Sequence, residues 1–151
     1  MKAFRFRLQR VLELRETQLK TEESKLRLLL RQREEKQNEQ KNRQNALEQA
    51  YAANHGLPHL GSAELVALGH FSRRIERECQ ELTAAIEADG KRIDQQSAIV
   101  VQARSRVRLL EKLKEQRRAE WKTESDHELE ELAGEFSNAQ WLRLQRDGRR
   151  T

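Results

Sequence analysis

The sequence has very little of what interrupts a helix. It contains one proline and six glycines in 151 residues, and the proline shares the segment 55–61 with two of those glycines. Proline lacks an amide hydrogen and clashes with the preceding helical turn, while glycine raises the entropic cost of helix formation. This one cluster predicts a turn at about 55–61 between a helix over about 5–54 and a second over about 62–145. We expect Ser62 to cap the second helix, a possible break near Gly69, and a frayed tail over 146–151.

Cysteine and long apolar runs are also nearly absent. Cys79 is the only cysteine, which excludes a disulfide within the chain. No apolar run is long enough for a membrane span, and no charged-then-apolar leader is present. We therefore expect a cytoplasmic protein. Cys79 lies on an apolar helix face, where it is expected to be a core residue and not a nucleophile.

Patterns that carry catalysis or bind cofactors are missing. His55 and His59 have a spacing that suits metal binding on a helix, but they flank the predicted turn and have no cysteine or carboxylate beside them. No glycine-rich phosphate loop is present, so the chain is not expected to bind ATP. The sequence predicts no enzyme, no metal and no cofactor.

A charged fraction of 36% and a mean hydropathy of −1.00 fit either a long helix or disorder. Hydrophobic periodicity decides between them, because alternating steps of three and four are typical of a coiled coil. Such steps run through Leu8, Leu12, Arg15, Leu19, Glu22, Leu26, Leu29, Arg33, Lys36, Gln40, Arg43, Leu47 and Ala50. In the second arm they run through Ile75, Cys79, Leu82, Ile86, Asp89, Ile93, Gln96, Val100, Ala103, Val107 and Leu110. We predict an all-α fold, in which residues 1–151 form a single antiparallel two-helix coiled-coil hairpin with the C-terminal helix overhanging.

The overhanging part has its own pattern. After Leu110 we expect the phase of the apolar positions to slip, with a separate stripe at Leu129, Leu132, Phe136 and Ala139. An exposed apolar stripe is a docking candidate. Six acidic residues lie between 124 and 135, and no lysine or arginine lies between 122 and 143. This acidic face is either solvated or paired with a basic surface on a partner.

The first ten residues contain four cations and no acid, interleaved with Phe4, Phe6 and Leu8. Either this is a solvated helix start, or it binds an acidic protein surface, a membrane surface or nucleic acid. Cations at a helix N-terminus oppose the helix dipole, which favours a functional reason. The net charge is +5, but the two signs alternate along most of the chain, so nucleic acid is not expected as a partner.

Four parts of the sequence form an ordered pattern, namely 4–15 (FRFRLQRVLELR), 110–115 (LEKLKE), Trp121 and 129–133 (LEELA). This pattern resembles the FliJ family of flagellar export proteins and their injectisome counterparts. The resemblance implies a bacterial type III export component similar to the central stalk of rotary ATPases. Its expected partners are the hexameric export ATPase, the export gate membrane protein and export chaperones. It implies a cytoplasmic protein, peripheral at the inner face of the cell membrane, that is a monomer when free.

The resemblance also implies two contact surfaces. An ATPase-facing tip would comprise Phe4, Arg5, Arg7, Leu8, Arg10, Leu110, Leu113, Arg117 and Trp121. A surface facing the export gate would comprise Gln40, Leu47, Tyr51, Phe71 and Ile75. Glu78 departs from the small residue expected beside this second surface, and Phe71, Ile75 and Leu82 are equally compatible with packing inside the hairpin. A homodimerising coiled-coil scaffold and a nucleic-acid-binding coiled coil are the alternative functions.

Overall fold

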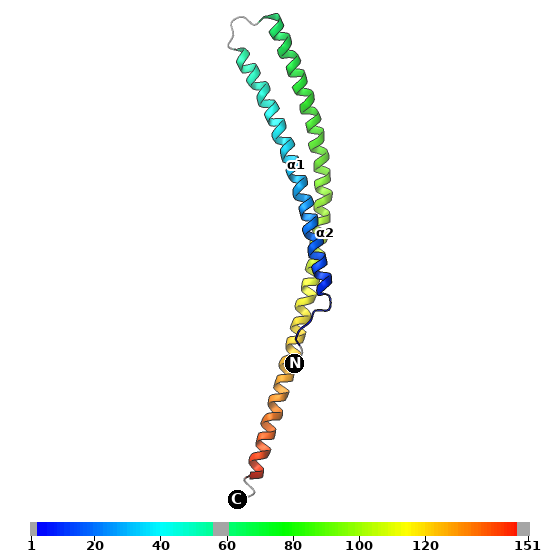
Figure 1. Ribbon diagram of the computed structural model, residues 1–151, viewed down its shortest axis with the longest axis vertical. Coiled ribbons are helices and arrows are strands. Elements are labelled where there is room, and N and C mark those ends of the chain that lie inside the picture. The colour runs from blue at the N-terminus through cyan, green and yellow to red at the C-terminus, as the bar shows by residue number, and fades with distance from the viewer. Residues whose placement is uncertain (1–2, 56–60, 148–151) are drawn as a thin grey trace. The chain divides into compact units, whose positions relative to one another are not determined.

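The chain folds into two long α-helices. The computed structural model describes residues 3–55 and 61–147, with side chains up to 145, and in these residues it contains helix α1 (Gln9–His55), helix α2 (Ser62–Asp147) and no strand (Figure 1). The predicted all-α fold is confirmed. Residues 56–60, which hold most of the predicted turn and His59, lie outside the described residues, as does the predicted tail from 148 onward.

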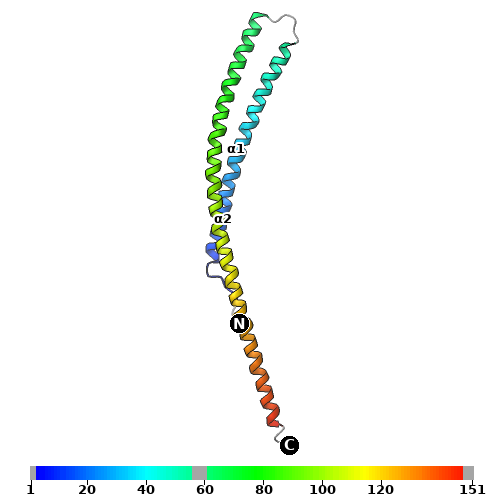
Figure 2. The same cartoon turned by 180° about the vertical axis from the view of Figure 1, so that it is seen from behind.

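The two helices divide into two compact units. The hairpin unit is Thr17–Arg104, and the terminal unit combines Met1–Glu16 with Ser105–Thr151. In the hairpin unit, contacts join residue 23 to 104, 36 to 89 and 51 to 72. Rising numbers on α1 meet falling numbers on α2, so the helices of this unit are antiparallel, and Figures 1 and 2 show them side by side.

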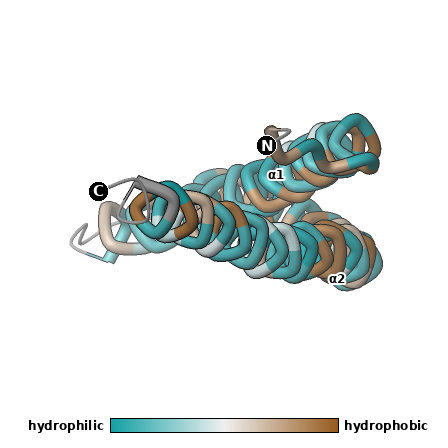
Figure 3. Tube along the Cα trace, turned by 90° about the horizontal axis from the view of Figure 1, so that it is seen from below, coloured by the Kyte–Doolittle hydropathy of each residue, from teal (hydrophilic) through white to brown (hydrophobic). Residues whose placement is uncertain are grey.

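The protected face of the hairpin unit follows the predicted three–four steps. Every position of the predicted series from Leu19 to Ala50 is half-buried, and every position from Ile75 to Ala103 is buried or half-buried. Ile75, Ile93 and Val100 are only 5%, 8% and 5% exposed. Burying such a side chain stabilises the fold by about 1.5–3 kcal/mol. Figure 3 shows the resulting pattern, in which brown hydrophobic residues recur among teal hydrophilic ones along both helices.

Charged and polar groups interrupt this apolar face in matched pairs. Asp89 is 2% exposed, and its Oδ2 lies 2.5 Å from Lys36 Nζ on the other helix. Gln40 Nε2 donates a hydrogen bond of 2.7 Å to Thr83 Oγ1. Sliding one helix along the other would leave a buried carboxylate without its cation. Such pairs therefore favour one register of the two helices.

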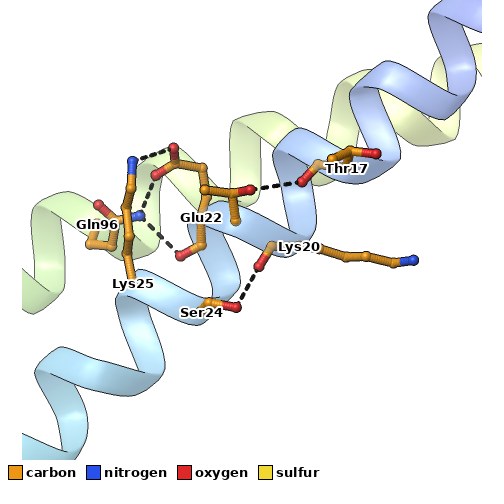
Figure 4. A network of polar contacts seen from close by, with 7 residues as sticks. Thr17, Lys20, Glu22, Ser24, Lys25 and Gln96 are labelled. Atoms are coloured by element: carbon orange, nitrogen blue, oxygen red, sulfur yellow. Dashed lines mark hydrogen bonds and ion pairs between the residues drawn. The ribbon is translucent and has the colours of Figure 1, made fainter.

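A third polar pair lies near Thr17 and Arg104, the residues that bound the hairpin unit. Gln96 Nε2 donates to the backbone oxygen of Glu22 at 3.1 Å and to its Oε2 at 2.6 Å (Figure 4). Lys25 Nζ lies 2.8 Å from Glu22 Oε1. The hydrogen bonds from Lys25 and Gln96 stabilise the carboxylate form and lower the pKa of Glu22 below its usual value of 4.5.

Helix α1 begins later than the sequence predicted, at Gln9 and not at residue 5. Leu8 O accepts the first helical hydrogen bond, 2.9 Å from Leu12 N, and residues 3–8 are not helical. The first turn of α1 contains no acidic residue. Three arginines at positions 5, 7 and 10 oppose the helix dipole, and leucine offers no side-chain acceptor as a cap. These features disfavour helix before Gln9.

Helix α2 is capped by Gly61, which corrects the prediction that Ser62 is the cap. Gly61 O accepts from Leu65 N at 3.2 Å, and Glu64 Oε2 accepts from Gly61 N at 3.0 Å. This is the reciprocal half of a capping box, with the glutamate at the third helical position. The sequence signal was Glu64 three residues after a glycine.

Two further predictions about α2 were wrong. The helix runs through Gly69 without a break, and residues 146 and 147, predicted as frayed tail, are helical. A glycine inside a helix costs about 1 kcal/mol relative to alanine. Next to Gly69 the helix is held by Ser72, which is 8% exposed and whose Oγ lies 3.0 Å from Tyr51 Oη. In the described residues, neither helix has an apolar stretch long enough to cross a membrane.

Candidate functional site

In the terminal unit, the N-terminal segment contacts the part of α2 around Trp121. The non-helical segment 3–8 lies against α2, and the Phe4 and Trp121 rings are 6.0 Å apart between centroids with an angle of 52° between their planes. A tilted aromatic pair of this kind contributes about 0.5–1.5 kcal/mol beyond its buried area. In Figures 1 and 2 the dark blue segment lies beside the yellow part of α2. This contact fixes the position of the basic N-terminal run on α2.

The terminal unit also has a small apolar core. Leu12 on α1 is 3% exposed and Val107 on α2 is 6% exposed, and Leu110 is half-buried. These side chains hold the first turn of α1 on α2. They thereby fix where segment 3–8 leaves the helix and which part of α2 it reaches.

Segment 4–8 and α2 form the two walls of a groove of about 650 Å³. The apolar lining residues are Phe4, Phe6, Leu8, Leu113 and Trp121, and the charged ones are Arg5, Arg7, Arg117, Glu120 and Glu124. Aromatic and arginine side chains are the residue types that most often dominate protein–protein binding energy. The groove therefore has the chemistry of a protein-binding site.

The charges of the groove are unevenly balanced. Arg117 Nη1 pairs with Glu120 Oε2 at 2.9 Å, with both side chains more than half exposed. Within the described part of the chain, Arg5 and Arg7 are exposed and form no ion pair. An acidic surface of a partner would supply the missing counter-charges, and this would favour rapid association.

Comparison with protein-family models, curated proteins and solved structures finds no match to this chain.

Most of the predicted ATPase-facing tip lies at this groove. It is lined by seven of the nine predicted residues, namely Phe4, Arg5, Arg7, Leu8, Leu113, Arg117 and Trp121. Arg10 is exposed outside it, and Leu110 is part of the supporting core. The prediction missed Phe6, Glu120 and Glu124. Phe6 belongs to the family-like segment 4–15, and Glu120 and Glu124 follow Arg117 by steps of three and four. The sequence therefore contained a signal for all three residues.

The predicted slip of phase does not begin directly after Leu110. Lys114 and Trp121, four and eleven residues after Leu110, are half-buried and Ser125 is 7% exposed, while Arg117 between Lys114 and Trp121 is exposed. At Trp121 this face is covered by Phe4, which precedes the first residue of α1 in the chain. Beyond Ser125 the described side chains of α2 are all exposed.

The residues predicted to face the export gate lie in the hairpin unit, and they differ in accessibility. Ile75 is 5% exposed, so it packs between the helices, and Gln40 hydrogen-bonds across them. Tyr51 is 42% exposed, whereas Leu47 and Phe71 are half-buried. A partner approaching this surface would first meet Tyr51 and the accessible part of Phe71.

Glu78, the residue that departs from the family pattern, has a structural partner. Its carboxylate pairs with Arg43 on α1 and lies 3.3 Å from Arg74 Nε on its own helix. The charge at this position therefore contributes to the contact between helices. Leu82, four residues further on, is half-buried on the same face.

The other candidate residues lack a site around them. Among the described residues no group of three His, Cys, Asp or Glu side chains is placed to hold a metal ion. His55 ends α1, while its predicted companion His59 is outside the described residues. Cys79 is half-buried on the protected face, as expected, and its backbone oxygen accepts a 2.9 Å hydrogen bond from Thr83 Oγ1.

Proposed function

We propose that this chain is a non-catalytic component of a flagellar or injectisome type III export apparatus. It binds a hexameric export ATPase through the groove of the terminal unit and stimulates ATP hydrolysis. The observation that carries the proposal is the meeting of Phe4 and Trp121. These residues belong to separate segments of the family-like pattern, and their meeting produces one surface with two free arginines.

The hairpin unit would supply the stiff element of such a stalk. We propose that its helices pack as a coiled coil, which the three–four pattern of burial supports. Tyr51 and Phe71 would form the accessible part of a surface that contacts the membrane-embedded export gate, and export chaperones are further partners. The protein would then be cytoplasmic and peripheral at the inner face of the membrane through these partners.

The proposal is tested by measuring ATP hydrolysis of the purified export ATPase from the same genome, with and without this chain. Arg5→Glu combined with Arg7→Glu should remove most of the stimulation, because like charges across an interface cost several kcal/mol. Arg27→Glu with Arg31→Glu is the matched control, since these arginines are exposed in the hairpin unit. Equal stimulation by the groove variant and the control would contradict the proposal.

A further inference from the structure

The apolar face of α2 continues past the part that the N-terminal segment covers. Leu129, Leu132 and Phe136 are 50%, 49% and 74% exposed. About five helical turns of 3.6 residues separate Trp121 from Ala139, so both lie on one face of α2. Leu129, Leu132 and Phe136 fall between them at helical spacing. In the terminal unit, the face that is covered up to Ser125 is thus open from Leu129 onward.

A row of carboxylates runs along one side of this open stripe. Glu124, Glu128, Glu131 and Glu135 follow each other by steps of four, three and four. Three of them line a shallow surface depression together with Leu132. Like charges at these spacings destabilise their own helix, so intrahelical stability does not explain the row. The stretch from 123 to 142 contains no lysine or arginine that would neutralise it.

We propose that Glu124–Ala139 is a docking surface for a basic amphipathic helix of a partner protein. The partner's apolar side chains would cover Leu129, Leu132 and Phe136, as an amphipathic helix lies in a hydrophobic groove. Its lysines or arginines would pair with the glutamate row. A second copy of this chain is disfavoured as an antiparallel occupant, because antiparallel symmetric pairing of the same face would bring the two glutamate rows together. The proposed surface shares Glu124 with the groove of the terminal unit, but its test uses neither the export ATPase nor the gate.

The test is a fluorescence-anisotropy titration of the full chain with a labelled synthetic peptide of leucine–lysine heptads. A second peptide, in which glutamate replaces each lysine, has the same apolar face. The basic peptide should bind and the acidic one should not. Glu128→Lys with Glu131→Lys should weaken binding of the basic peptide by about tenfold or more. A tenfold weakening corresponds to about 1.4 kcal/mol of binding free energy. Asp126→Lys with Glu130→Lys reverses the same number of charges on another side of α2 and should weaken binding much less.

The apolar half of the surface is tested separately. Leu132→Ala with Phe136→Ala should lower the affinity for the basic peptide by about tenfold, while circular dichroism shows unchanged helix content. Equal losses for the two charge variants would mean attraction to net charge alone and would overturn the proposal. So would unchanged binding by the alanine variant. If sedimentation shows a dimer of the natural chain that the alanine variant loses, the occupant is a second copy and the proposal is wrong.

Discussion

For the buried ion pair between Lys36 and Asp89, the structure predicts both the direction and the size of the change in the free energy of unfolding when one partner is replaced. Lys36→Met keeps the apolar stem and removes the ammonium that lies 2.5 Å from Asp89, whose side chain is 3% exposed. Breaking a buried pair by removing one partner costs about 3–5 kcal/mol. Lys36 is 35% exposed and Arg92 lies 3.9 Å from the other carboxylate oxygen, so both water and a second cation are near. We therefore expect a loss of about 2–3 kcal/mol in the free energy of unfolding.

Removing the other partner should have a different result. Asp89→Leu places an apolar side chain on the apolar face, and Lys36 can extend its ammonium into water. This variant, and the double variant with Lys36→Met, should be within about 1 kcal/mol of the natural chain or more stable.

The assay for this pair is urea unfolding at 25 °C followed by circular dichroism at 222 nm. Arg74→Met is the control, because Arg74 is 68% exposed in its ion pair and such pairs contribute about 0–1 kcal/mol. Equal stability of the Lys36→Met and Arg74→Met variants would mean that the buried pair contributes no more than an exposed one. A loss in Asp89→Leu as large as that in Lys36→Met would mean that the loss does not come from an unpaired buried carboxylate.

Two other predictions concern single contacts. Because Lys25 is the main cause of the lowered pKa of Glu22, this carboxylate stabilises the hairpin unit above pH 4.5, and the stabilisation is lost as the pH falls through the lowered pKa. Glu22→Gln should therefore flatten the acid limb of a plot of unfolding free energy against pH, and an unchanged limb would contradict the assignment. Phe4→Ala should expose the Trp121 ring, which is measured as stronger acrylamide quenching in a background with the other tryptophan replaced. Unchanged quenching would mean that segment 3–8 does not lie on Trp121 in solution.

The sequence predicted the helices and their facing sides because burial follows a simple period. The apolar positions from Ile75 to Val107 repeat every three or four residues, and the polar members Asp89 and Gln96 fall in the same steps. Their partners Lys36 and Glu22 are predicted to face the second arm by the same period. The pairing itself depends on the register of the two arms, which the sequence does not specify until the length of the turn is known.

Two predictions that were wrong, a break at Gly69 and a helix that begins at residue 5, concern places where neighbouring contacts or charges outweigh the local helix propensity. Gly69 lies within a continuous helix because neighbouring contacts of the helix outweigh its modest cost. Residues 5–8, which were predicted to be helical, do not form helix, since the cations oppose the helix dipole and Phe4 contacts Trp121. That contact joins residues far apart in the chain, and only the family-like pattern gave a sequence signal for it. Seven of the ten residues that line the groove were therefore predicted as part of one contact surface, while its non-helical wall was not predicted.

Stimulation of an export ATPase by the groove of the terminal unit is measured most directly as the rate of ATP hydrolysis by the purified ATPase hexamer while this chain is added in increasing amounts. We expect a saturable increase that the Arg5→Glu, Arg7→Glu variant largely loses and the hairpin-unit control retains. A rate that does not change on addition of the natural chain would contradict this expectation.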